Sequence, residues 1–288
     1  MTARILTALC LSLALAGANA QTTPPAPPAP KPAAGDEAKS AASDTPPDEK
    51  AYREAGKMAD PEKKIAALEG IKKDFPDSRY VSAANWQIFN TLIQKMPDQK
   101  ERIRKAAKAL FAASVAKDRA TSRENKITTM ASRGSTAERI ADQLTTAGLL
   151  LKDAESYARR SEKALSENVW MAEQRAAYAR EKMNVPSQEA MAKDFAETRA
   201  SRIGVLGRVE LKLGRTAEAQ KLLDESYAVT PSDEDVAAAL GDLAVKAGDD
   251  AKAMEYLLSA RLSGRAPDTA NQAFETLYKK GHNGSSTA

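Results

Sequence analysis

The chain has almost none of the side chains that most enzymes use for covalent, redox or metal chemistry. Its 288 residues include one cysteine, Cys10, and one histidine, His282. We expect Cys10 to be removed with the N-terminal segment, which excludes a disulfide framework, a thiolate nucleophile, cysteine-ligated zinc and C-x-x-C redox chemistry in the mature chain. His282 has neither triad partners nor further metal ligands near it in the sequence. We therefore expect no catalytic site, no metal and no cofactor.

The chain also has few aromatic residues, no nucleotide-binding loop motif and a small net charge. Only 5% of the residues are aromatic, and the sequence has neither G-x-G-x-x-G nor a phosphate-binding loop. A net charge of +4 at pH 7 argues against a nucleic-acid binder, which needs a concentrated basic face. The strongest basic cluster, at residues 100–108, is diluted by Glu101 and Asp98. We interpret it as a solvated helix face, with an acidic partner or anionic lipid as the alternative.

The N-terminus has the pattern of a secretory signal peptide. Arg4 supplies a positive charge before the apolar run 5–16, whose 12 residues are too few for a stable membrane anchor. Ala18-Asn19-Ala20 predicts cleavage between Ala20 and Gln21. No later segment is apolar enough to cross a membrane. We therefore expect residues 1–20 to be removed and the mature protein to be soluble in the periplasm or secreted.

The rest of the chain divides by composition into three segments. Residues 21–49 are rich in proline and alanine, which predicts a disordered spacer, with a ligand for a proline-binding domain as the alternative. Residues 50–281 have helical periodicity and no sustained strand alternation. Residues 282–288 are expected to form a flexible tail. The predicted fold class is therefore all-α after a disordered N-terminal segment.

Proline and capping residues divide the helical region into short helices. Pro61 is expected to open one helix, and Phe75-Pro76-Asp77-Ser78 to close it. Ser135-Thr136-Ala137-Glu138 matches a capping box, and Pro186-Ser187 predicts the start of another helix. Further N-caps are predicted at Thr216, Ser232, Asp249 and Asp268.

A 34-residue internal repeat is the most informative feature that is present. The residues Gly207, Gly214, Ala219 and Leu223 recur 34 positions later as Gly241, Gly248, Ala253 and Leu257. We expect the first glycine and the alanine of each copy to lie where two helices approach closely, and the leucines Leu206, Leu223, Leu240 and Leu257 to fill the space between helices. Gly214 and Gly248 should end the first helix of each pair in a left-handed conformation.

This period and residue order resemble the tetratricopeptide repeat, a helix–turn–helix unit. The resemblance implies an α-solenoid of stacked helix hairpins over residues 50–281 and a non-catalytic role in binding a protein or peptide partner. The match is incomplete, because the slots often taken by Trp and Tyr hold Ile203 and Glu210 in the first copy. The segment 61–92 also resembles a repeat variant of exported bacterial scaffold proteins, in which a helix ends in F-P-x-S.

In this family the first helix of each pair lines a concave groove. The resemblance places four charged residues there, which we predict as contacts for a protein or peptide: Arg208, Lys212, Asp242 and Lys246. The alternative is that these side chains lie on a solvated helix face. Trp86 and Trp170 are expected to pack between helices, with a role as groove aromatics as the alternative.

A second hypothesis comes from another class of protein. Residues 48–284 resemble the helical regions that precede the redox domain in some exported thioredoxin-like oxidoreductases. Without C-x-x-C this chain could not carry out thiol–disulfide exchange itself. It would then position a substrate for a redox domain that the chain does not contain.

Overall fold

The computed structural model describes residues 45–282, which belong to one compact unit beginning at Thr45. These residues form helices joined by short turns, with no strand in that range, which confirms the all-α prediction. None of these helices is both long and apolar enough to cross a membrane. The predicted signal peptide, its cleavage site at Ala20 and Gln21, and residues 21–44 and 283–288 lie outside the described range.

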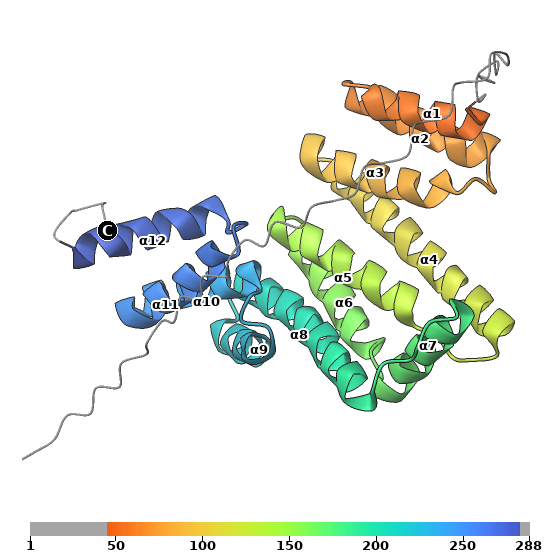
Figure 1. Cartoon of the computed structure of the whole chain (residues 1–288). Helices are drawn as coiled ribbons and strands as arrows, with labels where there is room; N and C mark the ends of the chain where they lie inside the picture. Colours follow the sequence, from red (N-terminus) through yellow and green to blue (C-terminus); the bar gives the residue numbers. More distant parts are fainter. Residues whose placement is uncertain (1–44, 283–288) are drawn as a thin grey trace, which may run out of the picture. The chain divides into compact units, whose positions relative to one another are not determined.

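Between residues 45 and 282 the chain forms twelve helices (Figure 1). In order they are α1 (Pro47–Lys57), α2 (Pro61–Asp74), α3 (Tyr80–Lys95), α4 (Lys100–Asn125), α5 (Ala131–Thr146), α6 (Leu151–Lys163), α7 (Glu167–Arg180), α8 (Gln188–Lys212), α9 (Thr216–Val229), α10 (Glu234–Ala247), α11 (Asp250–Leu262) and α12 (Asp268–Gly281).

Helix α1 begins at Pro47, inside the segment that composition predicted to be a linker. Proline at the first helical position costs no hydrogen bond, and Asp48 and Glu49 place negative charge at the positive end of the helix. The Ser78 hydroxyl donates to Asp48 over 2.7 Å, and the Arg79 guanidinium donates to Glu49 over 3.0 Å. These contacts extend the ordered helices into the predicted linker.

Several helix ends lie where the sequence predicted them. Helix α2 begins at Pro61 and ends before the turn at residues 75–78. The Ser187 side chain caps α8, and the Asp249 side chain caps α11. Helix α4 is the longest of the described helices, with 26 residues, and ends at Asn125.

Three predicted N-caps were wrong by one position. The N-cap positions of α9, α10 and α12 are held by Arg215, Asp233 and Pro267 instead of Thr216, Ser232 and Asp268. At α10 the Asp233 carboxylate accepts hydrogen bonds from the amides of Asp235 and Val236, each over 3.1 Å. An aspartate next to a serine therefore takes the cap, since the carboxylate is the better acceptor for free amides.

The capping box predicted at Ser135–Glu138 was also wrong, because α5 begins earlier, at Ala131. Its N-terminus is capped from other helices. The buried Asp118 carboxylate of α4 accepts hydrogen bonds from the amides of Ser132 and Arg133, each over 3.0 Å. Glu173 of α7 accepts one from the Met130 amide. A cap supplied by a distant part of the chain leaves no local signal in the sequence.

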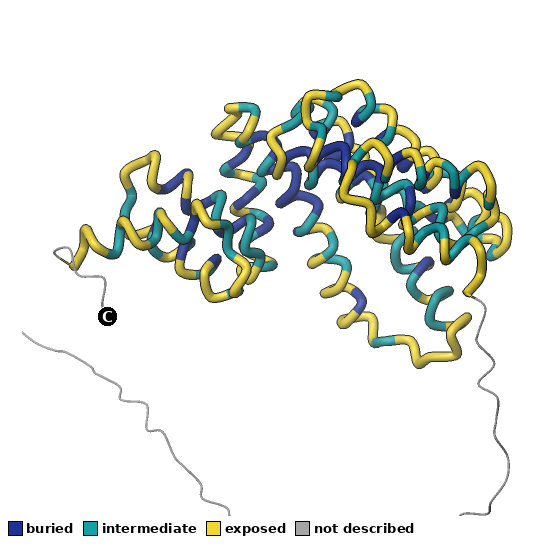
Figure 2. The backbone as a smooth tube through the Cα atoms, turned by 90° about the horizontal axis from the view of Figure 1, so that it is seen from above, coloured by how far each residue is buried: buried dark blue, intermediate teal, exposed yellow. Residues whose placement is uncertain are grey.

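The C-terminal helices contact one another in a regular order. Helices α5 and α6, α8 and α9, and α10 and α11 form three hairpins. Helix α8 also contacts both members of the preceding α5–α6 hairpin, and α10 contacts both members of the α8–α9 hairpin. Each first helix is therefore a neighbour of the first helix before it. Figure 2 shows that the buried residues lie on the inner sides of the helices, while the exposed residues lie on the outer sides and at the turns.

The repeated glycines lie at the closest helix contacts, as predicted. A Cβ atom built on Gly207 would lie 2.9 Å from Leu223 Cγ, and one on Gly241 would lie 2.6 Å from Leu257 Cδ2. The leucines cannot move away easily, since they are at most 1% exposed. Gly214 and Gly248 follow the first helices with φ of +79° and +75°, which confirms the predicted left-handed ends.

Replacing Gly241 by alanine should destabilise the protein, because the added methyl group would clash with Leu257. Overpacking of this kind costs about 1–3 kcal/mol, more than the roughly 1 kcal/mol that alanine gains over glycine in a helix. Urea unfolding followed by circular dichroism should show a lower free energy of unfolding.

Gly70→Ala in α2 is the matched control, because no atom lies within 4 Å of the added methyl group. This variant should gain up to about 1 kcal/mol of stability. Equal changes in the two variants would contradict the assignment of Gly241 to a close helix contact.

Candidate binding groove

One of the four predicted groove residues lines a pocket of the described structure, and the other three lie outside that pocket. Arg208 lines a cavity of about 550 Å³ between α5, α8 and α10. Lys212 is exposed near the end of α8, outside this cavity. Asp242 and Lys246 also lie outside it, and form an ion pair of 2.7 Å along the surface of α10. The structure therefore does not bring the four residues together.

The cavity around Arg208 is formed by helices that come first in their hairpins. Its walls include Ser135 and Glu138 of α5, Ser201 of α8 and Ser232 in the turn before α10. We call it the α5–α8–α10 pocket. Asp142 of α5 lines both this cavity and a second one of about 270 Å³ between α3 and α5, the α3–α5 pocket. The two pockets together are called the groove.

Arg208 joins the three helices of the larger pocket. Its guanidinium contacts Asp142 of α5 and lies 2.8 Å from Asp235 of α10. The Arg208 side chain is only 14% exposed, so its charge is largely used within the protein. Burial raises the pKa of Asp235, and the nearby Arg208 guanidinium acts in the opposite direction. Arg208, which was predicted as a contact for a ligand, therefore links α5, α8 and α10 within the protein.

The negative charge of Glu138 in the pocket is only weakly compensated by a nearby cation. Oε1 of this side chain accepts a hydrogen bond from the Ser201 hydroxyl over 2.6 Å, but the nearest cation, Arg202 Nε, lies 3.7 Å from Oε2. Burial raises the pKa of Glu138, against the opposing effects of Ser201 and Arg202. Arg202 is buried beside Gly134, where an added Cβ would lie 2.7 Å from the guanidinium, and it donates to the Ser161 carbonyl over 2.7 Å.

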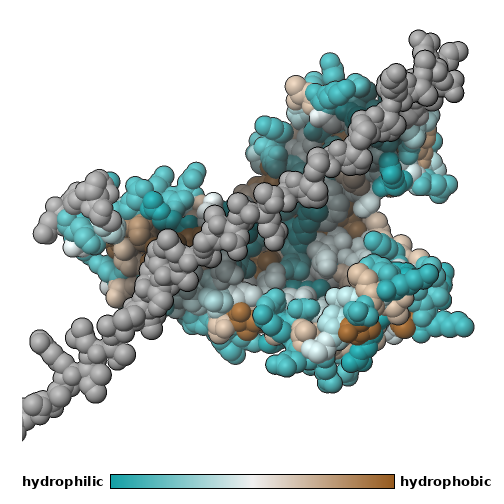
Figure 3. Space-filling view, in the orientation of Figure 1, coloured by the Kyte–Doolittle hydropathy of each residue, from teal (hydrophilic) through white to brown (hydrophobic). Residues whose placement is uncertain are grey.

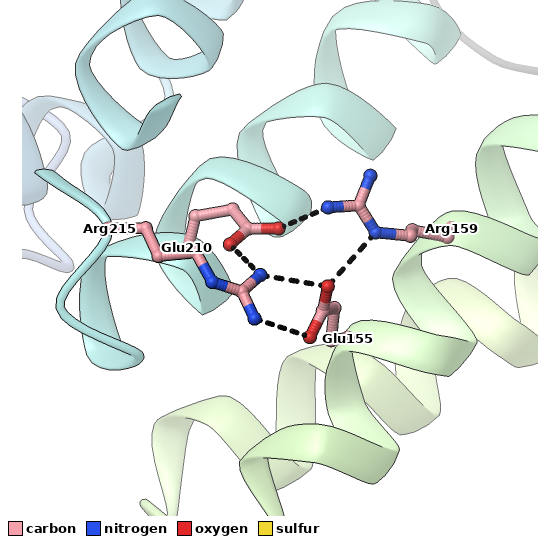
Figure 4. Close-up of polar contacts among 4 residues, drawn as sticks. All are labelled: Glu155, Arg159, Glu210 and Arg215. Atoms are coloured by element: carbon pink, nitrogen blue, oxygen red, sulfur yellow. Dashed lines mark hydrogen bonds and ion pairs between the residues drawn. The ribbon is translucent and has the colours of Figure 1, made fainter. Parts of the chain in front are cut away.

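A second charged cluster joins α6 to α8 and the start of α9 (Figure 4). Glu210 is fully buried and accepts hydrogen bonds from Arg159 and Arg215, each over 2.6 Å. Glu155 accepts from the same two arginines, at 3.1 Å and 2.8 Å. The four charges cancel, and each one contacts both charges of opposite sign. We interpret this cluster as a clamp between helices rather than as a binding site.

The two tryptophans pack between helices, as predicted. Trp86 lies edge-to-face against Phe89, and the Arg139 guanidinium lies 4.1 Å from the centre of its ring. Trp170 lies edge-to-face against Phe195 across α7 and α8. The basic cluster at residues 100–108 is partly neutralised by Glu101, as the sequence predicted, which contacts Arg104. Two further pairs come from distant residues: Arg102 with Glu62 over 2.6 Å, and Arg104 with Asp153 over 2.9 Å.

No model of a known protein family matches this chain, and no curated protein matches its sequence. The functional assignment therefore depends on the geometry of the groove. On the face that Figure 3 shows, most of the coloured surface is hydrophilic, with apolar side chains in scattered places.

Replacing Glu210 by alanine should destabilise the protein strongly, because Arg159 and Arg215 would lose their buried partner. Breaking a buried ion pair costs about 3–5 kcal/mol, and we expect about 2–3 kcal/mol here since both arginines are partly exposed. Urea unfolding would measure the loss. The exposed Glu218→Ala on α9 is the control and should change stability by less than about 0.5 kcal/mol; a similar loss in both variants would exclude the clamp.

Two glutamates should contribute to stability with opposite dependence on pH. Hydrogen bonds, first from Arg215 and then from Arg159, hold the pKa of Glu155 below its ordinary value of 4.5, whereas burial raises that of Glu138 above it. The contribution of Glu155 is present above pH 4.5 and is lost as the pH falls through its folded pKa. The contribution of Glu138 is present below that value and is lost as the pH rises through its folded pKa.

Urea unfolding between about pH 3 and pH 7 should therefore show opposite pH trends in the stability of two conservative variants. As the pH rises, Glu155→Gln should become less stable relative to the wild type, and Glu138→Gln should become more stable. Trends of the same sign in both variants would contradict the contacts described for one of the two glutamates.

Proposed function

We propose that this chain is an exported, non-catalytic binding protein whose groove holds an extended segment of a protein partner. In this proposal the helix hairpins are tetratricopeptide-like units that stack as a solenoid, and the protein acts in the periplasm or outside the cell. The proposal combines the N-terminal signal pattern and the 34-residue repeat with the position of the groove.

The observation that carries the proposal is that first helices of three successive hairpins line one cavity. Helices α5, α8 and α10 each contribute side chains to the α5–α8–α10 pocket. The α3–α5 pocket shares Asp142 with it and is lined by α3 on its other side. A row of side chains from successive helices suits a ligand that extends across several of them, such as a peptide segment.

The charge arrangement also favours binding over catalysis. Arg208 is held by Asp142 and Asp235, and the Glu155–Arg215 cluster lies apart from the pocket with its charges paired. The pocket presents hydroxyl and carboxylate groups at its wall, which can exchange hydrogen bonds with a polypeptide.

Site-specific photo-crosslinking tests this function. A benzoylphenylalanine at Ser135, an exposed residue at the pocket wall, should form adducts with a defined partner protein in the producing cells. The same group at the exposed Ser166, outside the pockets that form the groove, should not.

A blocked groove provides the second control. Ser232→Trp places a large side chain at the pocket rim and should abolish the adducts formed from position 135. Ser166→Trp should leave them unchanged. Adducts of equal yield from positions 135 and 166, or adducts that persist in Ser232→Trp, would exclude the groove as the binding surface.

A further inference from the structure

We propose that the groove selects a basic segment, with an arginine or lysine side chain of the partner occupying the α5–α8–α10 pocket. This inference rests on the proposed binding function and adds the chemistry of the ligand. It depends on which charged groups of the pocket are already used within the protein, and on which carboxylate oxygens of the pocket can still accept a hydrogen bond.

The pocket has more carboxylates than available cations. Five acidic residues line it: Glu138, Asp142, Asp233, Glu234 and Asp235. Three arginines also line it, and each one is engaged. Arg208 contacts two of the aspartates, Arg265 lies 3.3 Å from Glu234, and Arg139 covers the Trp86 ring. The arginines therefore leave Glu138 and Asp233 without an arginine partner inside the pocket.

Asp233 and Glu138 keep acceptor capacity toward a ligand. The hydrogen bonds from the α10 amides both reach Oδ1 of Asp233, and the Ser201 hydroxyl reaches Oε1 of Glu138. The other oxygen of Glu138 has only the Arg202 contact at 3.7 Å, which is too long for a hydrogen bond. A cation that enters the pocket would compensate a carboxylate whose charged form is disfavoured by burial.

A donor-rich cation suits this surface better than an anion. An anion would have to compete with Asp142 and Asp235 for Arg208, in a pocket that also presents Glu138 and Asp233. A guanidinium or ammonium group instead supplies several N–H donors together with the missing positive charge.

Fluorescence anisotropy with labelled octapeptides tests the inference on the whole mature chain. The probes are (Gly-Arg)₄, (Gly-Lys)₄ and (Gly-Glu)₄, each with a fluorescein group. We expect the two basic peptides to bind, the acidic peptide not to bind, and the affinity to fall as salt rises. Glu138→Gln should weaken binding of (Gly-Arg)₄ by about tenfold, since one charge-assisted contact is removed.

The control for general attraction of basic peptides is Glu255→Gln, which makes the same change of charge at an exposed position of α11, outside the pockets that form the groove. It should leave the affinity within about twofold, as expected for a distant screened charge. Ser232→Trp, which keeps every carboxylate, should also abolish binding of the basic peptides. Circular dichroism confirms that each variant is folded.

The outcomes separate the inference from the proposed function. If crosslinking from position 135 captures a partner but Glu138→Gln and Glu255→Gln bind (Gly-Arg)₄ equally, the basic-segment inference is wrong while the groove function stands. Equal binding of the acidic and basic peptides overturns the inference in the same way. If position 135 forms no specific adduct, the proposed function itself fails.

Discussion

The close contact between a leucine and a glycine sets the distance between paired helices, and the groove depends on that distance. Leu223 lies over Gly207, and Leu257 lies over Gly241. A side chain at either glycine would push the second helix of the pair away from the first. Because each first helix also contacts the preceding hairpin, a shift in one pair would move the helices that line the α5–α8–α10 pocket. The packing within each helix pair therefore determines the positions of the helices that line the groove.

Charged contacts then hold neighbouring hairpins in register. Arg208 connects α5, α8 and α10 in the pocket, and the Glu210 cluster connects α6 to α8 and the start of α9. Paired charges with fixed partners are satisfied in only one alignment, since a displaced Glu210 would be buried without its arginines.

The sequence predicted the helix ends that depend on local residues. It failed at helix ends that depend on contacts with residues far away in the chain. Pro61, Gly214, Gly248 and Asp249 act within one turn of their own position, so their helix ends were predicted correctly. The start of α5 was missed because Asp118 and Glu173 cap it from two other helices. The same limit applies to the groove: the resemblance to the tetratricopeptide repeat placed Arg208 on a lining helix, but Asp142 lies 66 residues away in the chain and could not be recognised as its partner.

Because Arg208 is paired with Asp142 and Asp235, other groups must determine which ligand the proposed groove selects. A free arginine there would attract acidic ligands, whereas the sequence predicted Arg208 only as a contact for a protein or peptide. With Arg208 paired with two aspartates and Lys212 outside the pocket, carboxylates outnumber the arginines that line the pocket. In the proposed basic-segment binding, selectivity follows from this surplus of carboxylates rather than from Arg208. Because Asp142 faces both pockets, a ligand that displaced it from Arg208 would disturb the contact between hairpins, whereas a basic ligand can bind with that contact intact.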